Sequence, residues 1–229
     1  DNHYHQLLRV PGKVKLNDDQ LSEKVRRYYG ERSRELNAWE SARRTKGKVL
    51  RTLRKRYFKR MANLSEYKKT LKQSFSRWYN LRHDRRGTLW MERFTSLLVE
   101  DIWPIPSLVA AYIDLNPVRA QLVEDPKSYP FNGYAAALRG DLRCQQGIQE
   151  VMKIKDWKRA ASAYRTHLMQ RGHIEVEGKS GSISKKLLLE TLSAEEALPG
   201  SDLLHSRVPH FTAGLALGSA SFVEKIYPQ

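Results

Sequence analysis

The chain has 229 residues, 40% of them hydrophobic, which is enough to bury a core in one or two domains. No run of about 18 apolar residues occurs, so we expect no membrane-spanning helix. The single cysteine, Cys144, excludes an intrachain disulfide and a multi-cysteine zinc finger, and a reducing cytoplasm is the expected location.

The charge is strongly uneven along the chain. Residues 1–100 carry 26 Lys and Arg against 11 Asp and Glu, a net of +15 within a total of +16. The stretch 41–60 holds ten basic residues and no acid. A solvated helix face is the simple interpretation, but ten uncompensated cations repel one another without a polyanionic partner. Aromatic residues among the cations, in KRYFKR and SRWYNLRH, favour nucleic acid over an anionic membrane.

The N-terminal stretch HYHQLLRV alternates in the manner of a short β-strand. On a strand, His3 and His5 share one face, and two neutral imidazoles there can supply half of a divalent metal site. A solvated chain end or a cloning remnant is the alternative explanation for such a histidine pair.

Helices are predicted next. Residues 17–62 have helical periodicity, and Asn63 is the expected cap of a further helix that ends near residues 84–87. Three helices are expected: one that Gly30 ends, one from about Lys46, and the one after Asn63. Their predicted apolar stripes are, in that order, Leu21, Val25 and Tyr28; Leu50, Leu53 and Tyr57; and Leu71, Phe75 and Trp78 or Tyr79.

The remaining elements are a second strand over residues 93–99, a short helix over residues 107–116, and one or two amphipathic helices over residues 145–172. Pro117 is expected to end the short helix. On that helix Tyr112 and Asn116 lie four residues apart and therefore share a face.

Three blocks in this order resemble the REP-associated tyrosine transposases of the single-tyrosine HUH (His–hydrophobic–His) superfamily. The blocks are NHYH, FSRWYNLRHDRRGTLWMERFTSLLVED and AAYIDLNPVRAQLVEDPKSYPFNGY. The resemblance covers roughly residues 1–143, with a weak region over residues 12–62. The tail LLHSRVPHFTAGLALGSASFVEKIY is similar to a C-terminal extension of some bacterial members.

The resemblance implies metal-dependent cleavage and transfer of single-stranded DNA. His3, His5 and Asn116 match the ligands of Mg²⁺ or Mn²⁺, and Tyr112 matches the nucleophile. Tyr79 is the rival nucleophile, and Tyr112 could instead be an ordinary core tyrosine. The predicted DNA-binding residues are Arg54, Lys55, Arg56, Arg77, Arg82, Arg86, Trp90 and Arg93.

The fold that the resemblance implies is α+β, with a ferredoxin-like antiparallel sheet and helices in an N-terminally incomplete HUH core. We expect this core over residues 1–143, with a basic helical insertion at about 17–62, and a mainly helical extension over residues 144–229. The predicted function is that of a transposase-like endonuclease acting on hairpin-forming repeat DNA, as a monomer or a homodimer at the nucleoid. The alternative is a non-catalytic nucleic-acid-binding protein or an inactive remnant.

Overall fold

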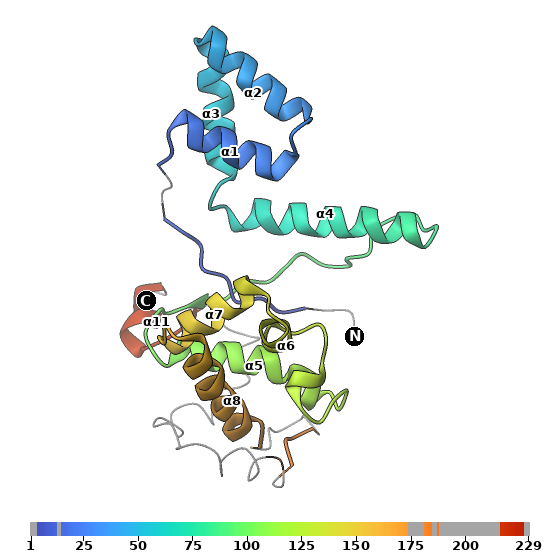
Figure 1. Cartoon of the computed structure of the whole chain (residues 1–229), viewed down its shortest axis with the longest axis vertical. Coiled ribbons are helices and arrows are strands. Elements are labelled where there is room, and N and C mark those ends of the chain that lie inside the picture. The colour runs from blue at the N-terminus through green and yellow to red at the C-terminus, as the bar shows by residue number, and fades with distance from the viewer. Residues whose placement is uncertain (1–3, 13–14, 174–180, 185–186, 188–215, 227–229) are drawn as a thin grey trace. The chain divides into compact units, whose positions relative to one another are not determined.

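The computed structural model describes residues 4–12, 15–173, 181–184, 187 and 216–226 (Figure 1). The chain forms two compact units, one of residues 8–94 and one that joins residues 1–7 to residues 95–229. Residues 8–94 contain 26 Lys and Arg against 9 Asp and Glu, a net of +17, whereas the other unit has a net of −1. The net positive charge of the chain therefore comes entirely from the unit of residues 8–94.

Three helices of the basic unit form a bundle: α1 (Asp18–Tyr29), α2 (Arg34–Thr45) and α3 (Lys48–Arg60) (Figure 1). Asn17 and Gln20 form a capping box at the start of α1, and Ser33 caps α2. The bundle core comprises Leu21, Val25, Leu36, Trp39 and Tyr57. The predicted helical region 17–62 is confirmed, but Tyr28, expected on the buried face, is 57% exposed.

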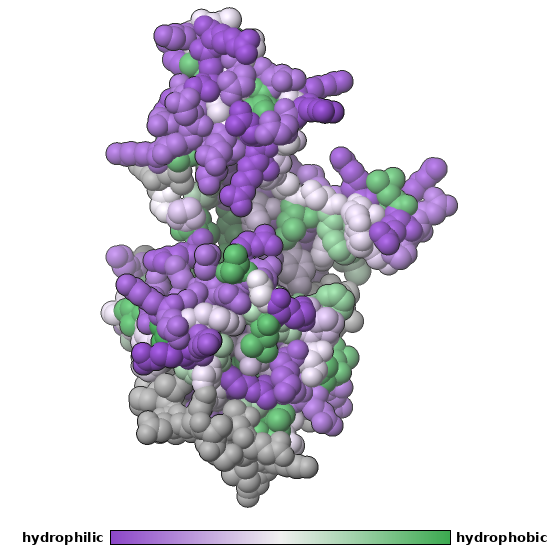
Figure 2. Space-filling model, in the orientation of Figure 1, coloured by the Kyte–Doolittle hydropathy of each residue, from purple (hydrophilic) through white to green (hydrophobic). Residues whose placement is uncertain are grey.

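The fourth helix of this unit, α4 (Leu64–Arg82), begins where the sequence predicts, because the Asn63 side chain accepts a hydrogen bond from the Glu66 amide at 3.0 Å. Its predicted apolar stripe is not a core, since Phe75 is 43% and Trp78 is 51% exposed. Figure 2 shows hydrophilic side chains over most of the visible face of α1–α3, while hydrophobic patches interrupt the surface along α4.

The second unit is built around α5 (Ile105–Arg119), which is buried on nearly all sides. The other helices are the 3₁₀ turn η1 (Pro126–Ser128), α6 (Gly133–Leu138), α7 (Leu142–Met152), α8 (Trp157–His173) and α11 (Ala220–Ile226). One or two amphipathic helices were predicted over residues 145–172; the structure has two, and α7 begins earlier, at Leu142. Their buried residues Ile148, Met152 and Leu168 pack with Leu115 of α5 in one hydrophobic core.

The predicted end of the Tyr112 helix is wrong, because α5 continues through Pro117 to Arg119. Proline lacks the amide that would donate to the carbonyl four residues earlier, so it costs one helical hydrogen bond. Here Pro117 and Val118 are buried, and we attribute the continuation to that packing. Pro106 lies in the first turn, where a helix amide needs no internal acceptor.

The predicted α+β fold with a ferredoxin-like antiparallel sheet is wrong. The described chain is mostly helical and contains one sheet of two parallel strands, β1 (Leu98–Val99) and β2 (Ala216–Leu217). Residues 4–10 form neither helix nor strand, and only the end of the predicted strand 93–99 pairs. Alternation does not make a strand without a neighbouring strand to complete its hydrogen bonds. Among the described residues, we find no helix with the length and apolarity needed to cross a membrane.

Candidate functional site

Two regions contain the residues singled out by the sequence. The first is formed by α4 and the segment that follows it. Trp90 Nε1 donates to the Lys72 carbonyl at 3.2 Å, and Lys72 Nζ donates to the Glu92 carbonyl at 2.8 Å. Asn80 Nδ2 donates to the Gly87 carbonyl at 2.8 Å. These bonds hold residues 87–92 against the helix.

Aromatic rings from both parts form a group that we call the aromatic cluster: Phe75, Trp78, Tyr79, His83 and Trp90. The Phe75 ring centroid lies 5.6 Å from that of Trp78 and 5.8 Å from that of Trp90, and Tyr79 stacks on His83 at 4.1 Å. Exposed rings of this kind offer faces on which unpaired bases can stack.

Cations lie over three rings of the aromatic cluster. Lys72 Nζ is 5.0 Å from the Trp90 centroid, the Arg82 guanidinium is 5.7 Å from Trp78, and that of Arg85 is 6.0 Å from Tyr79. The combination of positive charge and ring faces suits a single-stranded nucleic acid, whose phosphates and bases are both accessible.

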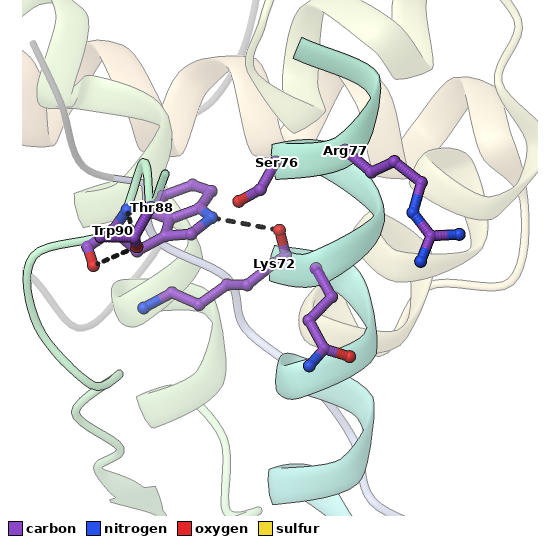
Figure 3. A pocket seen from close by; sticks show the side chains of 6 residues that line it. Lys72, Ser76, Arg77, Thr88 and Trp90 are labelled. Atoms are coloured by element: carbon purple, nitrogen blue, oxygen red, sulfur yellow. Dashed lines mark hydrogen bonds between the residues drawn. The ribbon is translucent and has the colours of Figure 1, made fainter. Parts of the chain in front are cut away.

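A hollow of about 440 Å³ opens beside Trp90 (Figure 3). Its lining residues are Lys72, Gln73, Ser76, Arg77, Thr88 and Trp90. Trp90 forms one side. The Thr88 hydroxyl donates to the Trp90 carbonyl at 3.0 Å, and the Arg77 side chain points away from Trp90 (Figure 3), so the groups that can meet an anion beside the ring are the Lys72 ammonium and the Ser76 hydroxyl. The hollow can therefore take a phosphate with a ring beside it.

The predicted DNA-binding residues have different surroundings. Arg77 and Trp90 line the hollow, Arg82 lies on Trp78, and Arg86 and Arg93 are exposed in the segment after α4. On α3, Lys55 and Arg56 are exposed. Arg54 differs from them, because its guanidinium pairs with Asp18 and donates to the Leu16 carbonyl at 2.9 Å. Arg54 therefore holds the bundle together as well as adding charge.

The second region surrounds Tyr112 on α5. The His5 ring, from the N-terminal segment of the same unit, lies edge-on to the Tyr112 ring with 6.2 Å between centroids and an interplanar angle of 72°. His5 is exposed, whereas Tyr112 and Asn116 are half-buried one helical turn apart. The fold thus joins two predicted site residues from distant parts of the sequence.

The predicted metal site is represented only in part. His3 lies outside the described residues, and residues 4–10 lack the strand on which the shared face of His3 and His5 depended. Within the described ranges, no three His, Cys, Asp or Glu side chains group as they would around a metal ion. His5 and the amide oxygen of Asn116 remain as donors of suitable chemistry beside Tyr112.

Arg119 is a functional candidate that the sequence reasoning did not single out. It lies seven residues after Tyr112 on α5, on the same helix face, and it is 9% exposed. Burial lowers the pKa of the Arg119 guanidinium, and its electrostatic interaction with Tyr112 opposes that change. Arg119 Nη2 donates to the Arg171 carbonyl of α8 at 3.1 Å, which fixes its position. The spacing of seven residues between Tyr112 and Arg119, which places both on one helix face, is visible in the sequence YIDLNPVR.

A buried carboxylate supports the Tyr112 helix from behind. Asp114 accepts hydrogen bonds from the Tyr164 hydroxyl at 2.8 Å and from the amides of Gly133 and Tyr134 at 3.1 and 3.3 Å. These bonds join α5 to α6 and α8. No pattern in the sequence indicates that Asp114 and Tyr164 meet, because they lie on different helices.

No family model matches the sequence, and neither the curated proteins nor the solved structures that were searched contain a match.

Proposed function

We propose that this chain is a tyrosine-dependent, single-stranded DNA endonuclease and strand transferase that acts on hairpin-forming DNA, in the manner of a transposase. The observation that carries the proposal is the contact of His5 with Tyr112. This contact joins a predicted metal ligand and the predicted nucleophile, although His5 and Tyr112 are far apart in the sequence.

In the proposed reaction, the Tyr112 oxygen forms a bond to a backbone phosphorus while the bond from phosphorus to the 3′ oxygen breaks. The products are a 5′-phosphotyrosine and a free 3′-hydroxyl, and the proton lost by tyrosine is balanced by the one gained by the 3′ oxygen. Arg119 lies on the same face of α5 as Tyr112, where its positive charge would stabilise the negative charge of the phosphate under attack.

His5 and Asn116 would hold a Mg²⁺ or Mn²⁺ ion, with His3 as the third predicted ligand. Such an ion, when bound, polarises the non-bridging phosphate oxygens. The aromatic cluster, with Lys72, Arg82 and Arg85 over its rings, would bind and orient the strand, which converts the attack into a positioned, intramolecular event.

The test uses a hairpin oligonucleotide with a single-stranded flank, labelled at its 3′ end, and Mn²⁺. A covalent protein–DNA adduct should appear on a denaturing gel, and Tyr112→Phe should abolish it. Tyr79→Phe, which removes the rival hydroxyl, should retain it, as should Tyr129→Phe at a half-buried position outside α5. His5→Ala should reduce the rate at least about tenfold. An adduct that survives Tyr112→Phe refutes the assignment.

A second function is favoured by a different observation. The aromatic cluster, with Lys72, Arg82 and Arg85 over its rings, suits nucleic-acid binding without any chemistry. Tight binding of the same oligonucleotide with no adduct from the unsubstituted protein would support this alternative, a non-catalytic nucleic-acid-binding protein.

A further inference from the structure

Helix α3 has two chemically different sides. Leu50, Leu53 and Tyr57 face the bundle core. On the opposite side, Lys48, Arg51, Lys55 and Lys59 follow one another at spacings of three, four and four residues, which places them on one face of the helix. All four are exposed, and Arg56 is exposed beside them.

Four of the six acids of the bundle, and Glu66 of α4, form ion pairs with other cations. Asp18 pairs with Arg54, Asp19 and Glu40 pair with Arg43, Glu31 pairs with Arg26, and Glu66 at the start of α4 pairs with Arg60. Within the part of the chain that the structure describes, no ion pair involves the four cations of the outer face of α3. The fold therefore uses one set of cations, all arginines, to hold the bundle and leaves another, of three lysines and one arginine, at the surface.

We propose that this outer face is a docking surface for double-stranded DNA, in addition to the single-stranded site at the aromatic cluster. The four cations span residues 48–59, about 17 Å along the helix axis. The major groove of B-DNA is about 12 Å wide and admits an α-helix, so cations along this face can meet phosphates at the groove. One exposed neutral side chain, Thr52, lies among these cations, so the face is expected to contact the DNA backbone with little reading of sequence.

The composition of the face selects among polyanions. Membrane binding requires several apolar side chains that insert beside the cations. On α3 the one exposed apolar side chain is Val49, whereas Tyr57 is buried and Phe58 packs against the core. Stacking on unpaired bases lacks a ring for the same reason. The major groove of A-form RNA is too deep and narrow for side chains to read. Duplex DNA remains the best match.

The experiment compares the unsubstituted protein with two variants, each of which removes three lysines and one arginine. The α3 variant combines Lys48→Gln, Arg51→Gln, Lys55→Gln and Lys59→Gln. The matched control combines Lys155→Gln, Lys158→Gln, Arg159→Gln and Lys225→Gln, all at exposed positions of the other unit. Binding to a blunt 20-base-pair DNA is followed by fluorescence anisotropy between 50 and 200 mM KCl.

Each lost phosphate contact lowers the slope of log K against log salt by about 0.9, so the α3 variant should lose about 3 to 4 units of slope. At 0.1 M salt its affinity for the duplex should fall at least about 100-fold, and that of the control less than about threefold. The single variants Lys55→Gln and Arg51→Gln should each lose about 0.9 units of slope, which keeps the test valid if the fourfold variant unfolds.

Three outcomes overturn the proposal. In the first, the α3 variant and the control lose equal affinity, which means that only total charge matters. In the second, binding to a 20-nucleotide single strand falls by the same factor as binding to the duplex. In the third, a 20-base-pair RNA binds the unsubstituted protein as tightly and depends on the same residues. None of these results concerns Tyr112, whose adduct assay uses a different substrate and readout.

Discussion

Replacing Tyr164 with phenylalanine tests the buried support of the Tyr112 helix. The Tyr164 side chain is fully buried on α8, and its hydroxyl donates to the Asp114 carboxylate at 2.8 Å. Phenylalanine keeps the ring and its edge-to-face contact with Tyr134, with 5.8 Å between centroids. The substitution therefore removes one hydrogen bond and leaves almost no cavity.

The expected cost follows from the partner's charge and burial. A hydrogen bond to a charged group contributes about 1.5–3 kcal/mol to stability, and Asp114 is only 6% exposed. Asp114 keeps the amides of Gly133 and Tyr134 as donors, so the carboxylate is not left wholly unsatisfied. We expect Tyr164→Phe to lower the free energy of unfolding by about 2 kcal/mol at pH 7.

The effect should depend on pH. Burial raises the pKa of Asp114, and the hydrogen bond from Tyr164 acts in the opposite direction. A carboxyl whose pKa is raised by folding favours the native state at low pH, and that advantage is lost as pH rises through the folded pKa. Without the Tyr164 hydroxyl the Asp114 pKa rises further, so the variant loses most stability above that pKa and least when the carboxyl is protonated in both proteins.

The assay is urea unfolding at pH 7 and pH 3.5, with hydrogen-exchange mass spectrometry of peptides from α5 and α8 to isolate this unit. Tyr129→Phe, at a half-buried position where the ring lies against Phe131, is the control and should change stability by less than about 0.5 kcal/mol. A Tyr164→Phe protein as stable as the control at pH 7, or a loss that is equal at both pH values, would refute the reasoning.

Three further predictions concern other parts of the structure. Burial, assisted by the charge of Arg171, lowers the pKa of His167 to about 4. Because the unfolded histidine titrates near pH 6.5, the free energy of unfolding should have its full value above pH 6.5 and fall by about 3 kcal/mol as the pH drops to 4. His167→Gln should weaken this pH dependence in urea titrations. A Cβ on Gly172 would lie 2.3 Å from Ile183 Cδ1, so Gly172→Ala should cost about 1–3 kcal/mol by thermal unfolding, and an unchanged melting temperature would contradict this packing. Trp90→Ala should weaken binding of a single-stranded oligonucleotide about 10- to 100-fold, whereas an equal loss for duplex DNA would argue against stacking.

Local features were predictable from the sequence because they depend on neighbours in the chain. The caps at Asn63 and the helical periodicity of residues 17–62 and 145–172 involve residues three or four positions apart. The concentration of positive charge was also visible, and it coincides with the compact unit of residues 8–94.

The sheet was not predictable in this way. Alternation at positions 3–10, and β-branched and aromatic residues at positions 93–99, indicated strands, but a strand requires hydrogen bonds from a partner that local sequence does not specify. In the structure, β1 pairs instead with residues 216–217, and Glu100 accepts a hydrogen bond from the Ser219 amide at 2.5 Å. The antiparallel fold expected from the resemblance was wrong for this reason.

The sequence alone indicated that residues 17–62 and 145–172 are helical, that Asn63 caps α4 and where positive charge gathers, since each follows from residues close together in the chain. It did not indicate α6, and the contacts between distant residues are set by tertiary packing. Trp78, predicted on an apolar stripe, is exposed, and Arg54, predicted to contact DNA, pairs with Asp18. His5 reaches Tyr112 by the same long-range folding, because packing between distant segments sets such contacts and helical periodicity does not.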